Sequence, residues 1–155
     1  MDFDALMRDF AREIGIDEIE PDEDGFYRIS ADDAPVSVGT LPESGALVIW
    51  AEAGETPPEG REAFYRMLLE AAYAGGGTPG TQFSLDRRTG RVFLRAEDPS
   101  APDTLAGLQD RLDAFADALG DWRRRIADFR ASDTVRETAA DEGPVGFGQE
   151  GFIRI

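Results

Sequence analysis

The chain is 155 residues long, which is room for one domain, and 41% of it is hydrophobic, enough to build a core although 31% is charged. Its 32 acidic and 16 basic residues leave a net charge of −16, the wrong sign for neutralising phosphates. We therefore expect neither nucleic acid nor an anionic membrane as a partner, and favour a neutral or basic protein segment.

The chain has no Cys, no His and no Lys, and all sixteen of its cations are Arg. Thiolate and imidazole chemistry, Schiff bases and the phosphate-binding lysine of a Walker loop are thereby excluded. We expect no catalysis and no cofactor. The acidic start of the chain does not look like a secretory signal, and no run of about eighteen apolar residues occurs, so we expect a cytoplasmic protein.

In chain order, the first predicted element is a helix over residues 2–14, which Gly15 ends. Three short apolar runs follow at residues 26–29, 36–38 and 46–51, separated by Pro and Gly, and they predict three antiparallel strands. The third run is apolar at both odd and even positions. Both faces of the sheet should therefore need cover at this strand.

A second helix is predicted to start at residues 56–59, where Thr, Pro, Pro and Glu form a capping box with Pro at the first helical position, and to end near Tyr73. Its polar residues Glu62, Arg66 and Glu70 fall on one line, and the rest of its surface is apolar. A surface helix needs an apolar stripe only about 100° wide. We therefore expect this helix to pack on its own sheet on one side and on a second subunit on the other.

Two strands and a long helix complete the predicted domain. Residues 81–85 and 91–96 flank a turn that ends in Gly90, which predicts a hairpin. Ser100 and Asp103 are the expected caps of the helix that follows. Its apolar residues recur three or four positions apart: Leu105, Leu108, Leu112, Phe115, Leu119, Trp122 and Ile126.

After Phe129 the sequence becomes small and polar, so we expect a domain over residues 1–129 and a flexible tail over residues 130–155. The last residues, 147–155, form an apolar tip. The tip alternates like an edge strand, and we expect it to dock back on an apolar surface of its own or a neighbouring molecule.

Three motifs have ordinary structural explanations. Residues 20–25 resemble the first half of a calcium loop, but Ala31 stands where a bidentate Glu should be, so an acidic turn is favoured and no metal is expected. The glycines at 75–77 lack the Lys of a phosphate loop. The arginines at 123–125 lie late in a helix, where cations suit the helix dipole.

The predicted order of elements over residues 2–127 resembles the class I type III secretion chaperones, the CesT/Tir chaperone family. The strongest match is a junction in which Leu-Leu-Glu-Ala-Ala-Tyr at 68–73 and a Gly/Thr-rich break precede Phe-Ser-Leu-Asp at 83–86 and Gly-Arg-Val-Phe-Leu at 90–94. One departure is Ala72, where many relatives carry Asn. The resemblance implies an α+β fold of order α-β-β-β-α-β-β-α, with a twisted antiparallel sheet packed with three helices.

The resemblance also implies a homodimer around which the N-terminal segment of a secreted effector winds, so that the effector stays soluble and can be presented to the secretion ATPase. The dimer residues expected on the second helix are Phe64, Tyr65, Leu68, Leu69 and Ala72. The effector-binding residues expected on the first helix and third strand are Leu6, Phe10, Val48 and Trp50.

Two other functions stay open. A related family of small bacterial proteins, the YbjN-like proteins, shares this architecture without a secretion role, so a general interaction or regulatory module is one alternative. An acidic immunity protein that neutralises a toxin is another. The apolar surplus of the second helix favours the dimeric chaperone.

Overall fold

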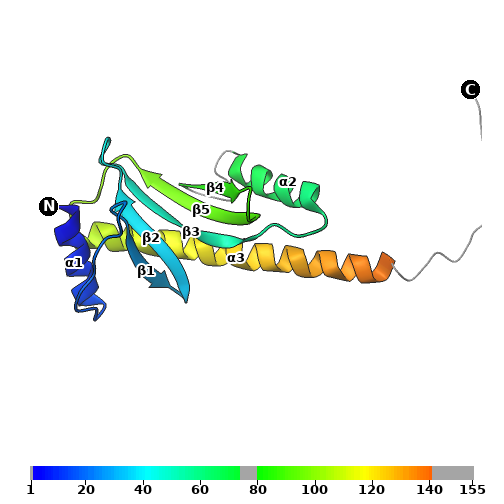
Figure 1. The fold of residues 1–155 in the computed structure, drawn as a ribbon, viewed down its shortest axis with the longest axis horizontal. Coiled ribbons are helices and arrows are strands. Elements are labelled where there is room, and N and C mark those ends of the chain that lie inside the picture. Colours follow the sequence, from blue (N-terminus) through cyan, green and yellow to red (C-terminus); the bar gives the residue numbers. More distant parts are fainter. Residues whose placement is uncertain (1, 74–79, 141–155) are drawn as a thin grey trace, which may run out of the picture.

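A computed structural model describes residues 2–73 and 80–140, and side chains as far as residue 132. The elements follow the chain as α1 (Phe3–Glu13), β1 (Tyr27–Ala31), β2 (Ala34–Thr40), β3 (Leu47–Glu55), α2 (Arg61–Ala72), β4 (Thr81–Asp86), β5 (Arg91–Asp98) and α3 (Leu105–Ala140). The strands form one antiparallel sheet with the helices packed against it (Figure 1). The predicted α+β fold and its order of elements are confirmed.

The sheet has the strand order β1-β2-β3-β5-β4, so β3 lies at its centre and β1 and β4 are its edges. Along β3, Leu47, Ile49 and Ala51 are part of the core under the helices, whereas Val48 and Trp50 line a hollow on the opposite face, where Val48 is only 2% exposed. Alternate side chains of a strand face opposite sides of the sheet, and on β3 both sets have apolar neighbours. This agrees with the apolar residues at both odd and even positions of the sequence.

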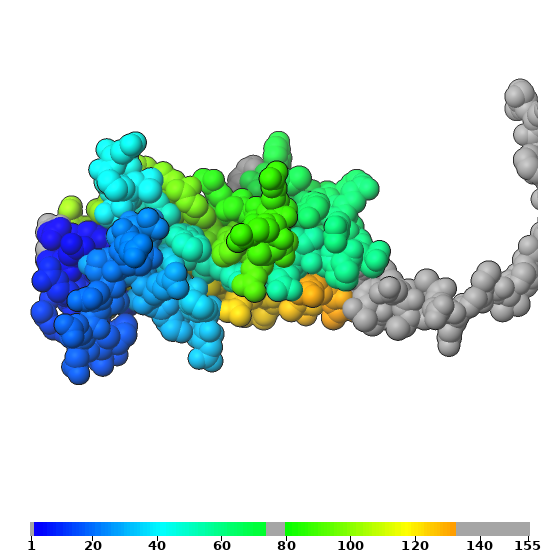
Figure 2. All heavy atoms as spheres, viewed as in Figure 1, coloured from blue at the N-terminus to red at the C-terminus, as the bar shows by residue number. Residues whose placement is uncertain are grey.

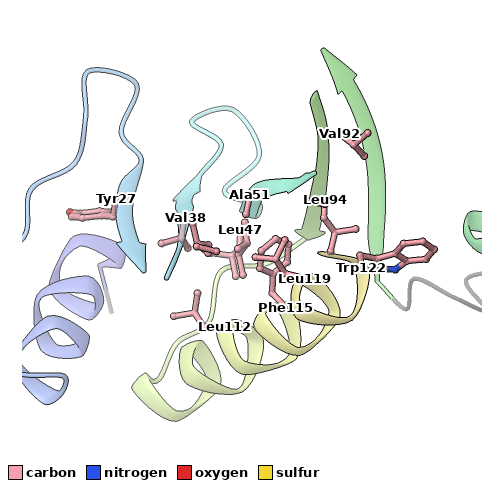
Figure 3. Close-up of a cluster of buried hydrophobic side chains, with 14 of the residues drawn as sticks. Tyr27, Val38, Leu47, Ala51, Val92, Leu94, Leu112, Phe115, Leu119 and Trp122 are labelled. Carbon is pink, nitrogen blue, oxygen red and sulfur yellow. The ribbon is translucent and has the colours of Figure 1, made fainter. Parts of the chain in front are cut away.

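The apolar stripe of α3 covers one face of the sheet. Its buried residues, three or four apart, are Leu108, Leu112, Phe115, Leu119, Trp122 and Ile126. In Figure 3, side chains of this stripe rise from the helix and meet Leu47 and Leu94 from the strands. Each fully buried side chain of this size contributes about 1.5–3 kcal/mol. The packing of α3 on the sheet is therefore a large contribution to the stability of the domain.

A bulge in β3 lets α3 approach the sheet closely. The register of β3 against β5 shifts between Glu52 and Gly54, and Gly54 has a φ of 156°. A Cβ atom at Gly54 would lie 2.6 Å from Cγ2 of Ile126. Only glycine leaves room for the helix at this point.

The other two helices pack at different points along α3, α1 near its start and α2 further along it (Figure 1). On α1, Leu6, Met7 and Phe10 are buried in the core that α3 shares. On α2, the ring of Phe64 meets that of Phe129, with centroids 5.3 Å apart. The three helices therefore share one core on one face of the sheet.

Both predicted helix caps were wrong. The helix α2 begins at Arg61 after Gly60, whose φ is 61°, and not at the Thr56 capping box. The reason is that the N–H of Thr56 donates to the carbonyl of Gly90 at 2.8 Å, which continues the pairing of β3 with β5. For α3, the cap is Thr104, whose Oγ1 accepts a hydrogen bond from the N–H of Gly107 at 3.1 Å.

The last helix is longer than predicted, because α3 continues to Ala140 and so includes the first part of the expected tail. Beyond Phe129, Arg130 forms an ion pair with Glu55 at 3.3 Å. The rest of the expected tail, residues 141–155 with the apolar tip at 147–155, lies outside the described residues. Within the described part of the chain, no helix has both the length and the apolar character needed to cross a membrane.

Candidate protein-binding surfaces

One face of the sheet carries no helix from the described part of the chain, because the buried side chains of all three helices belong to the core on the other face. We call this side the outer face. Its apolar centre, the outer-face patch, comprises Phe26, Leu41, Val48, Trp50 and Phe93, which line a hollow of about 330 Å³ together with Ser84 and Arg95. An apolar surface of this kind on a small acidic protein indicates a site for another protein segment.

Trp50 stands at the middle of the outer face. In the strand register it lies opposite Ser37 of β2 and Arg95 of β5, and its ring meets that of Phe93 edge to face. Arg95 forms an ion pair with Glu97, with 2.8 Å between Nη2 and Oε2. Since the arginine beside Trp50 is already paired with a carboxylate, apolar contact is what this surface offers.

The position of Phe26 depends on Gly39. A Cβ atom at Gly39 would lie 2.7 Å from Cδ1 of Phe26, so the phenyl ring rests on the glycine backbone. This contact places Phe26 beside Val48 in the patch. Val48 and Trp50 were expected from the sequence to lie on a binding surface, and they line this hollow. Phe26, Leu41 and Phe93 were not expected there, because the side of the sheet on which they lie depends on strand register and loop course.

The helix α2 presents a second apolar surface. The side chains of Leu69 and Tyr73, one helical turn apart, are 71% and 82% exposed, and Leu85 of β4 is also exposed. The helix α2 and the strand β4 are in contact and lie side by side in the space-filling view (Figure 2). We call Leu69, Tyr73 and Leu85 the α2–β4 patch.

The residues expected at a dimer interface divide into two groups. Phe64 and Leu68 are buried in the core of the single chain, and Tyr65 packs partly against it. Leu69 and Ala72 are exposed. Because α2 is apolar around most of its circumference, its sequence alone does not tell which side faces the sheet.

The residues expected to bind an effector are not brought together. Leu6 is fully buried in the core, and Phe10 lines a groove on the α3 side of the sheet. Val48 and Trp50 lie on the outer face, on the far side of the sheet. Because Leu6 is 0% exposed, it offers no surface to an effector in this structure, which corrects its expected role. A segment that contacted both Phe10 and Trp50 would have to pass around an edge of the sheet.

The groove that Phe10 lines is formed by α1, the β1–β2 hairpin and α3, and has a volume of about 510 Å³. We call it the α1–α3 groove. Its apolar lining residues are Phe10, Ile29, Ala31, Val36, Leu112, Phe115 and Ala116, and its polar ones are Ser30, Asp32, Asp113 and Asp117.

A third hollow, of about 420 Å³, lies between the start of α3 and the ends of β4 and β5. At its rim, Nε of Arg111 donates to Asp98 at 2.6 Å, and this hydrogen bond is the main reason that the pKa of Asp98 is lowered; the backbone N–H of Ser100 adds to the effect. The hydroxyl of Thr81 lines the hollow and is buried without a hydrogen-bond partner among the described residues. The hollow adjoins Gly80, where the description of the chain resumes.

Metal binding finds no support in the part of the chain that the structure describes, where no group of three or more His, Cys, Asp or Glu could hold an ion. In the calcium-like segment, Oδ1 of Asp22 accepts hydrogen bonds from the N–H groups of Asp24 and Phe26, at 3.1 and 2.9 Å. The carboxylate thereby closes an acidic turn.

The model of the Tir chaperone protein (CesT) family matches residues 5–123, and the chain belongs to this family, the class I type III secretion chaperones. Among curated proteins, none matches the chain.

Solved structures agree on the fold. The chain is similar to one chain of the ExsC–ExsE complex, with 26% identity and a TM-score of 0.67 over 79% of this chain and 91% of that one. It is also similar to a chain of the HopA1–SchA chaperone–effector complex, with 16% identity and a TM-score of 0.63 over 79% and 93%. A third is in the complex of the Yersinia pestis secretion chaperone SycH with a YscM2 fragment, with 22% identity and a TM-score of 0.56 over 78% and 99%.

Proposed function

We propose that this chain is a type III secretion chaperone that binds the N-terminal segment of an effector in extended form and keeps it soluble and competent for secretion. It does so in the cytoplasm, without catalysis, and hands the effector to the secretion ATPase. The observation that carries this proposal is the outer-face patch, an apolar surface with an aromatic centre on the side of the sheet opposite the core. Membership of the family and the chaperone–effector complexes among similar structures support it.

The outer-face patch suits an extended apolar segment better than a folded partner. Its hollow is bounded by side chains from several strands, with Trp50 and Phe93 as its largest rings. Successive side chains of an extended peptide alternate in direction, so every second residue can enter such a hollow. Aromatic residues held in a well-packed surface are the usual binding anchors.

The chain acts as a homodimer in this proposal, joined through the α2–β4 patch. Leu69 and Tyr73 are mostly exposed in the described part of the chain although both are large and apolar. Burying two such side chains against a second copy is favourable, at roughly 25 cal/mol per Å² of apolar area. A symmetric dimer would bring the same patch from each subunit together.

The experiment that tests the function has two steps. A tagged copy of the chain is purified from its native host, and the bound proteins are identified. The identified partner is then divided into an N-terminal fragment and the remainder, and each is titrated against the purified chain. The proposal expects the N-terminal fragment alone to bind, and to stay soluble only with the chain present. Binding of a folded C-terminal part instead would favour an immunity protein or a general interaction module.

A further inference from the structure

The α1–α3 groove combines two properties that define its occupant. Its floor is apolar, with Phe10, Leu112 and Phe115 from two helices. Its polar margin is acidic, with Asp32 from the β1–β2 turn and Asp113 and Asp117 from α3, and no arginine is among the residues that line it. A matching ligand is an apolar segment that carries a cation.

The groove also lies beside an edge of the sheet. Ile29 and Ala31, which line it, belong to β1, and within the described sheet β1 pairs only with β2. The outer edge of β1 therefore offers backbone N–H and C=O groups to another strand. An extended segment could pair with this edge and place every second side chain in the groove.

We propose that the occupant of the α1–α3 groove is the C-terminal segment of the same chain, residues 151–155, with the sequence Gly-Phe-Ile-Arg-Ile. In an extended strand, Phe152 and Arg154 lie on the same side. Phe152 then fills the apolar floor, and Arg154 meets Asp113 and Asp117. The alternation of apolar residues around one arginine matches the groove in both charge and hydrophobicity.

The length of the chain beyond α3 fits this assignment. From Ala140 back to Asp113 is a rise of about 40 Å along the helix, at about 1.5 Å per residue. An extended chain spans at most about 3.3–3.6 Å per residue, so the twelve residues from 141 to 152 reach about 40 Å. A fully extended segment therefore just spans this axial distance, and attachment to the same molecule raises its local concentration.

A peptide of residues 147–155 and a chain truncated after Ala140 test the proposal. The peptide should bind the truncated chain, and bind the full-length chain much more weakly, because the groove is already filled. Replacing Asp113 and Asp117 by Asn in the truncated chain should weaken peptide binding about fivefold, as expected for exposed charge pairs. In the peptide, Phe152→Ala should weaken it about tenfold or more.

A matched control is Asp121→Asn, which removes a carboxylate from the same helix but outside the groove, where it pairs with Arg124. It should leave peptide affinity unchanged. An equal loss of peptide affinity in Asp121→Asn would mean that net charge alone explains the effect, and it would overturn the proposal. A peptide that binds neither chain would overturn it as well. Circular dichroism of each variant shows that its fold is intact.

Hydrogen exchange identifies which molecule supplies the segment. Isotope-labelled full-length chain is mixed with an excess of unlabelled truncated chain, and exchange is followed at the amides of residues 27–31. If its own C-terminal segment fills the groove, the labelled chain keeps the slow exchange that it shows alone. Exchange that rises to the level of the truncated chain would assign the segment to a second copy and contradict the proposal.

Discussion

The indole ring of Trp50 and the phenyl ring of Phe93 meet edge to face on the outer face, with centroids 5.8 Å apart and planes inclined by 64°. The two residues come from neighbouring strands, β3 and β5, and neither belongs to the core that the helices cover. An aromatic pair of this kind contributes about 0.5–1.5 kcal/mol beyond its area burial, which fixes the shape of the surface before a ligand arrives.

Trp50→Ala should therefore weaken binding of the effector's N-terminal fragment by about 1–3 kcal/mol, since a central aromatic anchor is lost, while the fold remains. Titration calorimetry measures the affinity, and circular dichroism checks the fold. The matched control is Ile14→Ala, another exposed apolar residue, located after α1 and away from the patch. Equal losses of affinity in both variants would show that the outer-face patch is not the binding site.

The two sides of α2 should respond differently to a charge. Leu69→Asp should leave the chain folded and shift it from dimer to monomer in sedimentation equilibrium at micromolar concentration, because Leu69 is 71% exposed in the single chain. Leu68→Asp should unfold it, because an unpaired carboxylate in the core costs several kcal/mol. A Leu69→Asp variant that remains a dimer would show that the subunits associate elsewhere.

The hydroxyl of Tyr27 donates a hydrogen bond to Oδ1 of Asp4 at 2.8 Å, and the ring is buried. Burial is the main cause that raises the pKa of Tyr27 to about 12, and the hydrogen bond to Asp4 adds to it. Because the folded-state pKa is raised from 10.0, the stability linked to neutral Tyr27 is fully present below pH 10 and is lost as the pH rises toward 12.

Tyr27→Phe should accordingly lower the free energy of unfolding by about 0.5–1.5 kcal/mol at pH 7. The difference from the unsubstituted chain should shrink between pH 10 and 12, because the variant has no phenol to ionise. Urea denaturation at a series of pH values measures it. A gap that stays constant to pH 12 would contradict the raised pKa.

Gly54→Ala should destabilise the domain by about 1–3 kcal/mol, because the new methyl group would lie 2.6 Å from Cγ2 of Ile126 and the φ of 156° is unfavourable for alanine. Ile126→Ala removes that methyl group at its own cost in packing. In a double-mutant cycle, Gly54→Ala should cost less in the Ile126→Ala background than alone. Additive costs would mean that backbone strain, and not the contact, is responsible.

The sequence predicted the fold well where a pattern of apolar residues can be buried in only one way. The three-and-four spacing along α3 allows a single buried stripe, and Leu112, Phe115 and Leu119 are all in it. Local signals failed where a distant partner competed with them. The capping box at Thr56 did not form because its backbone pairs with Gly90, thirty-four positions away along the chain.

The binding surfaces were only partly predictable for a similar reason. Phe26 and Phe93 join the outer-face patch through the course of a loop and the register of a strand, which single-sequence patterns do not fix. On α2, Leu68 and Leu69 are neighbours with the same chemistry, yet only the contact with the core decides that Leu68 is buried.

The central claim, that an effector segment binds on the outer face, is tested most directly through Trp50 itself. The other tryptophan, Trp122, is 2% exposed, and Trp122→Phe leaves Trp50 as the only indole in the chain. Quenching of its fluorescence by acrylamide is measured with and without the effector's N-terminal fragment. The account predicts that the bound fragment shields Trp50 and reduces quenching. A fragment that binds with full affinity while Trp50 remains equally accessible would contradict it.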